Sequence, residues 1–266
     1  MKWIVGLVLL VGVCGSCQMQ TSTRVPDIPP NYQLLKAIFG SYDADSSTFT
    51  RPHKKWEPRH PYFKDVKFWV SYKKQLVLEG KQVLLVVCQA PVGRLHYHNF
   101  YSMGYYLFEI SRGQWKLFKR FGEDKESMDD DINGFDIIEI GENKKALISK
   151  YSHAGNSHEA QAYNLFHLSL NSLKYLGVVD LSYSNWQWNG LDVPEKAPCD
   201  RVKEYELSFE VVKNNKAWYD IKQLKKNYKF TRGCKNKYVD SREKLLYKFN
   251  GKKYVNILKK KGDIDE

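Results

Sequence analysis

The sequence lacks the features that identify most catalytic and membrane-spanning proteins. It contains no Gly-x-Ser-x-Gly, His-Glu-x-x-His or phosphate-binding glycine loop, which excludes the motif-bearing hydrolases, metalloproteases and nucleotidases. A catalytic triad that assembles from distant positions leaves no such motif, so the sequence is still compatible with a hydrolase. The apolar run from Trp3 to Val13 has 11 residues. At about 1.5 Å per residue, a helix of that length cannot cross a hydrocarbon core of about 30 Å.

This short apolar run is typical of a secretory signal. Lys2 supplies the positive charge before it, and small residues follow it at Gly15 and Ser16, directly before Cys17. The alternatives are an ordinary cleaved signal that happens to hold two cysteines, and a retained N-terminal helix. We predict a signal peptide over residues 1–16.

Residues Cys14-Gly15-Ser16-Cys17 resemble the lipobox of bacterial lipoproteins. The resemblance covers the first 17 residues and implies that Cys17 receives a diacylglyceryl group and becomes the acylated N-terminus. Cys14 stands where the family usually has Leu, Val or Ile; it could be the acceptor instead, but the β-branched Val13 before it fits poorly. Multiple acyl chains anchor firmly, because each buried CH₂ contributes about 0.8 kcal/mol. The resemblance implies a lipid-anchored protein of the cell membrane or outer membrane, with its domain outside the cytoplasm.

Cysteine is scarce, with five residues in all, and an exported domain would keep three of them. Cys199 and Cys234 each follow a turn residue, and an oxidising compartment favours a disulfide between them. Such a bond would close a loop of 35 residues and stabilise the fold by about 3–4 kcal/mol. Cys88 lies in the apolar run Leu-Leu-Val-Val-Cys-Gln, and we expect it to be a small buried residue.

The remaining sequence predicts a mainly β fold. Aromatic residues make up 14% and favour strands. Strand-like runs follow one another at roughly ten-residue spacing, with a continuous apolar run at 83–89 and an alternating run at 204–212. The runs 163–170 and 174–181 indicate a hairpin across Asn171-Ser172, and Asn250-Gly251 predicts a two-residue hairpin turn. We expect antiparallel sheets arranged as a sandwich, a barrel or a propeller, with one or two short helices at 31–39 and 220–226. Residues 17–30 form the lipidated cysteine and a tether, and 31–266 form one domain with a possible sub-boundary near 195.

Net charge is +12 but unevenly distributed. Residues 18–81 carry +5, residues 82–195 carry −4, and residues 196–266 carry +10. The last segment contains a basic stretch interleaved with Tyr228 and Phe230: Lys222, Lys225, Lys226, Lys229, Arg232, Lys235 and Lys237. It indicates either a solvated surface or a patch for anionic lipid, polyanionic glycan or an acidic protein. No nucleic-acid-binding fold is visible, so we expect no nucleic acid partner.

Histidines form one candidate metal site. His96 and His98 project to the same side if they lie on a strand, and His153 and His158 lie in a second loop. The four side chains could bind Zn²⁺ if they converge. The alternative is that they are ordinary loop residues.

A second candidate is the acidic run before residue 135. Asp129, Asp131 and Asn133 partly resemble a calcium loop, but Ile140 stands where the closing Glu belongs. The simpler interpretation is an acidic turn. A third candidate is the pair Trp186 and Trp188, whose rings could stack on sugar faces or lie in the core.

Two classes of function are compatible with these features. The first is a non-enzymatic envelope lipoprotein that binds an envelope protein or a polyanionic glycan through its basic C-terminal region. The second is a metal-assisted hydrolase that uses the loop histidines. The first requires no cofactor; the second requires Zn²⁺ or a similar ion. The sequence favours the binding module.

Overall fold

The computed structural model describes residues 25–41, 43, 48–52, 65–95, 98–122, 125–127, 131–155, 158–185, 202–231 and 236–258. Strand residues 51–52, 92–95, 98–100, 125–127, 131–133, 153–155 and 158 are described by their backbone alone. Among the described residues, no helix is long and apolar enough to cross a membrane.

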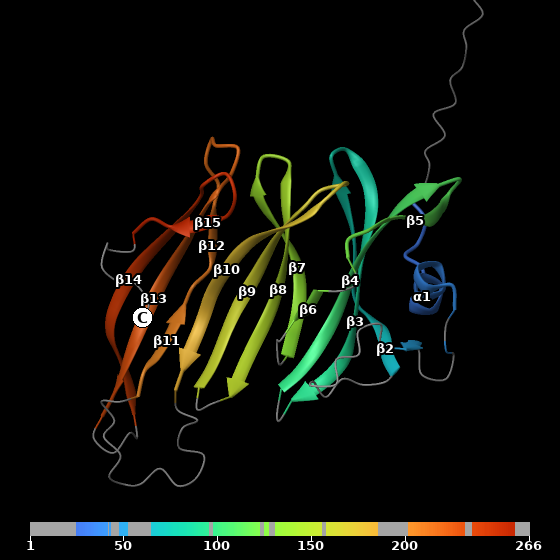
Figure 1. Ribbon diagram of the computed structural model, residues 1–266. Coiled ribbons are helices and arrows are strands. Elements are labelled where there is room, and N and C mark those ends of the chain that lie inside the picture. Colours follow the sequence, from blue (N-terminus) through green and yellow to red (C-terminus); the bar gives the residue numbers. More distant parts are fainter. Residues whose placement is uncertain are drawn as a thin grey trace, which may run out of the picture.

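The chain forms one helix and two antiparallel sheets (Figure 1). The helix is α1 (Asn31–Phe39). The six-stranded sheet has the order β1-β2-β3-β4-β5, with β6 beside β4. Its strands are β1 (Phe49–Pro52), β2 (Asp65–Leu78), β3 (Lys81–Leu95), β4 (His98–Ser111), β5 (Gln114–Arg120) and β6 (Lys125–Ser127). The expectation of a mainly β, antiparallel fold is confirmed.

The second sheet has nine strands in the order β15-β14-β13-β11-β10-β9-β8-β7, with β12 beside β13. They are β7 (Asp131–Gly141), β8 (Lys144–Gly155), β9 (His158–Leu168), β10 (Leu173–Ser184), β11 (Glu204–Leu207), β12 (Glu210–Val212), β13 (Asp220–Phe230), β14 (Lys237–Phe249) and β15 (Tyr254–Asn256). Most neighbours in both sheets are consecutive in sequence, as expected for hairpins.

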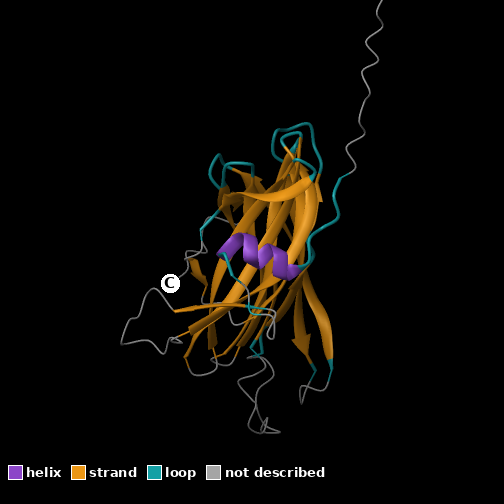
Figure 2. Ribbon diagram, turned by 90° about the vertical axis from the view of Figure 1, so that its right-hand side faces the viewer, coloured by secondary structure: helices purple, strands orange, loops and turns teal. Residues whose placement is uncertain are grey.

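The helix packs on one face of the six-stranded sheet. Leu34, Leu35 and Ile38 are buried, in the i, i+1, i+4 pattern of an amphipathic helix. They contact Phe68 and Tyr106 within one core cluster, and Figure 2 shows α1 lying across the strands. The helix ends at Gly40, whose φ of 83° lets its N–H donate to the carbonyl of Lys36. The predicted helix at 31–39 is therefore confirmed.

The other face of the six-stranded sheet packs on the nine-stranded sheet. Residues 83–88 of β3 are all buried, so β3 is covered on both faces, as its continuous apolar sequence predicts. Leu85 and Leu107 face Leu147 and Leu168 of the second sheet, whereas the thiol of Cys88 points into the helix-side core. Cys88 is thus a small buried residue, as expected.

The nine-stranded sheet curls so that its two edge strands meet at one end. Its core joins residues from β7 to β10 with Ile221 of β13 and Tyr254 of β15. The Tyr254 hydroxyl donates to the carbonyl oxygen of Tyr219 at 2.9 Å and lies 3.4 Å from that of Ile140 on β7. Trp218 stacks on Phe249 with ring centroids 3.9 Å apart. The sheet is therefore a half-barrel closed at this end by residues 213–219.

Three local expectations differ from the structure. Residues 220–226 belong to strand β13 rather than a helix, because β11, β12 and β14 supply partners for its backbone on both sides. The run 204–212 divides into β11 and β12, because the Ser208 hydroxyl accepts the Leu224 N–H in place of a backbone carbonyl.

The third difference concerns the turn between β14 and β15. Asn250-Gly251 predicts a two-residue turn, but the connection has four residues, since Phe249 pairs with Tyr254. The Asn250 side-chain oxygen accepts the N–H groups of Lys252 and Lys253, each at 3.0 Å. The Asn side chain therefore stabilises a wider turn.

Candidate binding face

Many sequence-predicted site residues lie outside the described part of the chain. These are Cys17, His96, Asp129, Trp186, Trp188, Cys199, Arg232, Cys234 and Lys235. His98, Asp131, Asn133, His153 and His158 lie on strands described by their backbone alone. The start of β4, the start of β7, the end of β8 and the start of β9 nevertheless lie at the same end of the molecule (Figure 1). Among the described side chains, no group of three or more His, Cys, Asp or Glu could hold a metal ion.

The predicted basic stretch is divided between the two faces of strand β13. Successive side chains of a strand point to opposite faces. Lys225 and Lys229 share a face with the buried Ile221 and Gln223, whereas Lys222 and Lys226 lie on the opposite face. The stretch is therefore not one continuous patch.

The two lysines on the Ile221 side have partners within the protein. The Lys225 ammonium lies 4.3 Å from the centre of the Tyr205 ring, a cation–π contact. The Lys229 ammonium bonds to the Asp240 carboxylate at 2.9 Å, and this hydrogen bond raises the pKa of Lys229. Burial, with a smaller contribution from Asp180, raises the pKa of Tyr205 to about 12, so its ring stays neutral beneath Lys225. The ammonium groups of Lys225 and Lys229 therefore make contacts within the protein.

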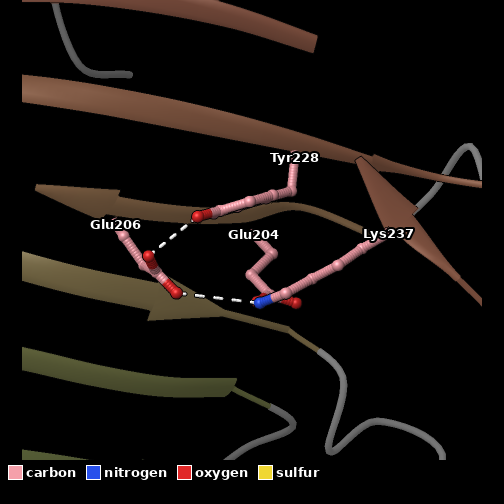
Figure 3. A network of polar contacts seen from close by, with 4 residues as sticks. All are labelled: Glu204, Glu206, Tyr228 and Lys237. Atoms are coloured by element: carbon pink, nitrogen blue, oxygen red, sulfur yellow. Dashed lines mark hydrogen bonds and ion pairs between the residues drawn. The ribbon is translucent and has the colours of Figure 1, made fainter. Parts of the chain in front are cut away.

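Lys237 is also neutralised within the protein, in the network shown in Figure 3. Its ammonium bonds to Glu204 and lies 3.7 Å from Glu206. The Tyr228 hydroxyl donates to Glu206 at 2.8 Å, and Lys237 lies 4.4 Å from the centre of the Tyr228 ring. The bond to Glu204 raises the pKa of Lys237, and the bond to Glu206 raises the pKa of Tyr228. Two carboxylates around one ammonium leave the network anionic, so Lys237 is a poor anion ligand.

The opposite face of β13 continues onto β14 and gathers more cations. The register pairs Lys222 with Leu246, Leu224 with Lys244, and Lys226 with Arg242. Lys248 lies two residues beyond Leu246 and shares its face. We call this surface the basic face. Its five cations are Lys222, Lys226, Arg242, Lys244 and Lys248.

The five cations of the basic face differ from Lys225, Lys229 and Lys237, whose side chains have partners among the described residues. None of the five forms an ion pair or hydrogen bond through its side chain with another described residue. Diagonal neighbours on an antiparallel pair, such as Lys222 and Lys244 or Lys244 and Lys226, have backbones about 7–8 Å apart. The cations therefore run along the two strands in a zigzag. Such a row can neutralise successive negative charges of an extended ligand.

The sequence pattern identified only part of this face. It included Lys222 and Lys226 but not Arg242, Lys244 or Lys248, which lie beyond the basic stretch along the chain. The signal that could have found them is their spacing: Arg242, Lys244 and Lys248 are two and four residues apart, so they share one face wherever 242–248 forms a strand. The pairing of β13 with β14 brings the two groups together.

Leucines interrupt the basic face and form a shallow groove. Leu224, Leu246 and Leu258 line it together with Lys222, Lys244, Ser208 and Glu210, and its volume is about 290 Å³. Leu224 and Leu246 are half-buried, and Leu258 is 52% exposed. The groove thus has an apolar floor and a charged rim.

Comparisons with known proteins identify no relative. No family model, curated protein or solved structure matches the chain. The site must therefore be interpreted from its own geometry.

Proposed function

We propose that this protein is a lipid-anchored envelope lipoprotein whose β domain binds a linear polyanion, most simply a polyanionic envelope glycan, through the basic face. The observation that carries the proposal is the row of five cations on β13 and β14 that have no partner among the described residues. Glu206 and Glu210 stand opposite Lys226 and Lys222 on the adjoining strands but form no ion pair with them. The five cations outnumber these two carboxylates and repel one another, and a bound polyanion reduces that repulsion. The acylated Cys17 would hold the domain at the membrane, beside such polymers.

The arrangement of the cations favours a linear polymer over a compact anion. They extend along the strands rather than converging on one point. Three other lysines could have widened the site, but their ammonium groups contact residues of the protein itself. Lys225 contacts Tyr205, Lys229 contacts Asp240, and Lys237 contacts Glu204. An acidic envelope protein is the other partner class, and it would have to present its carboxylates in a similar row.

Titration of the purified full-length protein with dextran sulfate tests this function. Uncharged dextran of equal length is the control. We expect binding to dextran sulfate that weakens steeply as salt rises, because each neutralised site releases a counter-ion, and no binding to dextran. Absence of binding at low salt, or an affinity that does not change with salt, would contradict the proposal.

A further inference from the structure

The basic face contains an apolar feature that a polyanion does not use. Leu224 and Leu246 lie on the solvent side of β13 and β14, where an antiparallel sheet usually carries polar residues. Leu258 and the adjacent Ile257 add further apolar surface, with exposures of 52% and 45%. Clustered apolar side chains on an exposed face commonly mark a binding site.

The groove suits hydrocarbon better than a peptide or a sugar. Backbone polar groups at its floor are already paired: the Leu224 N–H donates to the Ser208 hydroxyl at 2.9 Å, and the Leu246 carbonyl accepts the Ile257 N–H at 2.9 Å. Peptides and sugars would bring polar groups that find few partners there, and burying such groups without partners is costly. An acyl chain has no such groups.

The rim of the groove carries two ammonium groups and one carboxylate, that of Glu210, which stands opposite Lys222. Its net charge is therefore positive, which favours an acidic headgroup on the lysine side. Lys222 and Lys244 stand diagonally across it, and their methylene stems can extend its apolar walls while their ammonium groups remain in water. The volume of about 290 Å³ lies just below the range of roughly 300–1,000 Å³ for small-molecule sites. The space fits one chain rather than two.

We propose that this groove binds a single-chain anionic lipid, with the acyl chain against Leu224, Leu246 and Leu258 and the acidic headgroup between Lys222 and Lys244. This inference rests in part on the proposed function, because both ligands meet the same two lysines. It adds a separate apolar subsite, so the natural polyanion would be one that carries or neighbours acyl chains.

Calorimetric titration of the full-length protein with dodecanoate, below its micelle concentration, tests the subsite. We expect one dodecanoate per protein. Butanoate, which lacks the chain, should not bind, and neutral dodecyl maltoside should bind on the order of tenfold more weakly because it lacks the charge. Binding only to lipid vesicles, or equal binding of the charged and neutral dodecyl compounds, would overturn the proposal.

The variant Leu224→Ser with Leu246→Ser separates the two ligands. We expect it to weaken dodecanoate binding at least tenfold and to leave dextran sulfate binding within about twofold, because no cation is removed. The matched control, Val77→Ser with Val178→Ser, changes two exposed valines elsewhere and should alter neither ligand. Leu258→Asp, at a more exposed position, gives the same test if the double variant unfolds, because its carboxylate would repel the headgroup.

The outcomes distinguish the two proposals. If dextran sulfate binds and dodecanoate does not, the groove proposal is wrong and the polyanion function stands. If dodecanoate binds and dextran sulfate does not, the polyanion function is wrong and the groove proposal stands. Dodecanoate binding that survives both leucine variants would also overturn the groove proposal.

Discussion

Replacing Lys222, Lys226 and Lys244 together with glutamine is expected to weaken dextran sulfate binding roughly 100-fold at low salt. A lysine near an anionic surface contributes about a fivefold gain in affinity, and these three have no partner within the described chain to compensate for the loss. The dependence of affinity on salt should also become shallower, because fewer counter-ions are released. Titration across a series of salt concentrations measures both effects.

The matched control is Lys67→Gln with Lys81→Gln and Lys116→Gln. These exposed lysines lie on β2, β3 and β5 of the other sheet, and the control changes net charge by the same amount. We expect it to lower the affinity less than threefold. Equal losses in the two triple variants would mean that overall charge, rather than the basic face, controls binding.

Replacing Gly141 with alanine is expected to destabilise the fold by about 1–3 kcal/mol. A Cβ at this position would lie 2.2 Å from the carbonyl oxygen of Ala217, a backbone atom in the segment that closes the half-barrel. That segment is fixed by the Tyr219 N–H, which donates to the Ile140 carbonyl at 2.8 Å. The added methyl must therefore displace the closing segment. Urea unfolding followed by fluorescence measures the change in free energy.

Two further variants check the cause of this loss. Gly80→Asn, in a turn with open space and a φ of 78° that Asn tolerates, should change the unfolding free energy by less than about 0.5 kcal/mol. Adding Ala217→Gly to Gly141→Ala should not restore stability, because the close atom is a backbone oxygen. If the double variant regained the wild-type unfolding free energy, the Ala217 side chain rather than its carbonyl oxygen would be the group that the added methyl displaces.

Local parts of the fold were predictable because their signals are local. The helix from Asn31 has buried residues at the spacing that its sequence shows and ends at Gly40. The buried strand around Leu85 is visible as an uninterrupted apolar run. The hairpin of β9 and β10 follows from two runs separated by a short polar turn, although the pairing has irregularities near Leu176 and Leu181.

The rest depends on contacts between residues distant in sequence. Residues 220–226 contain Lys, Gln and Leu, which are good helix formers, yet pairing with β11, β12 and β14 makes them a strand. That same pairing decides which lysines share a face. Lys225 looks equivalent to Lys226 in sequence, but one lies over Tyr205 and the other beside Arg242. A one-residue shift of β13 would exchange them.

Anionic ligands are expected to meet the protein on the basic face of β13 and β14. Amine labelling of the full-length protein, with and without dextran sulfate and read by mass spectrometry at each lysine, tests this expectation directly. We expect four lysines of the basic face to react at least threefold more slowly in the presence of ligand: Lys222, Lys226, Lys244 and Lys248. The reactivity of Lys67, Lys81 and Lys116 should not change. Protection spread evenly over all lysines, or concentrated on the six-stranded sheet, would contradict it.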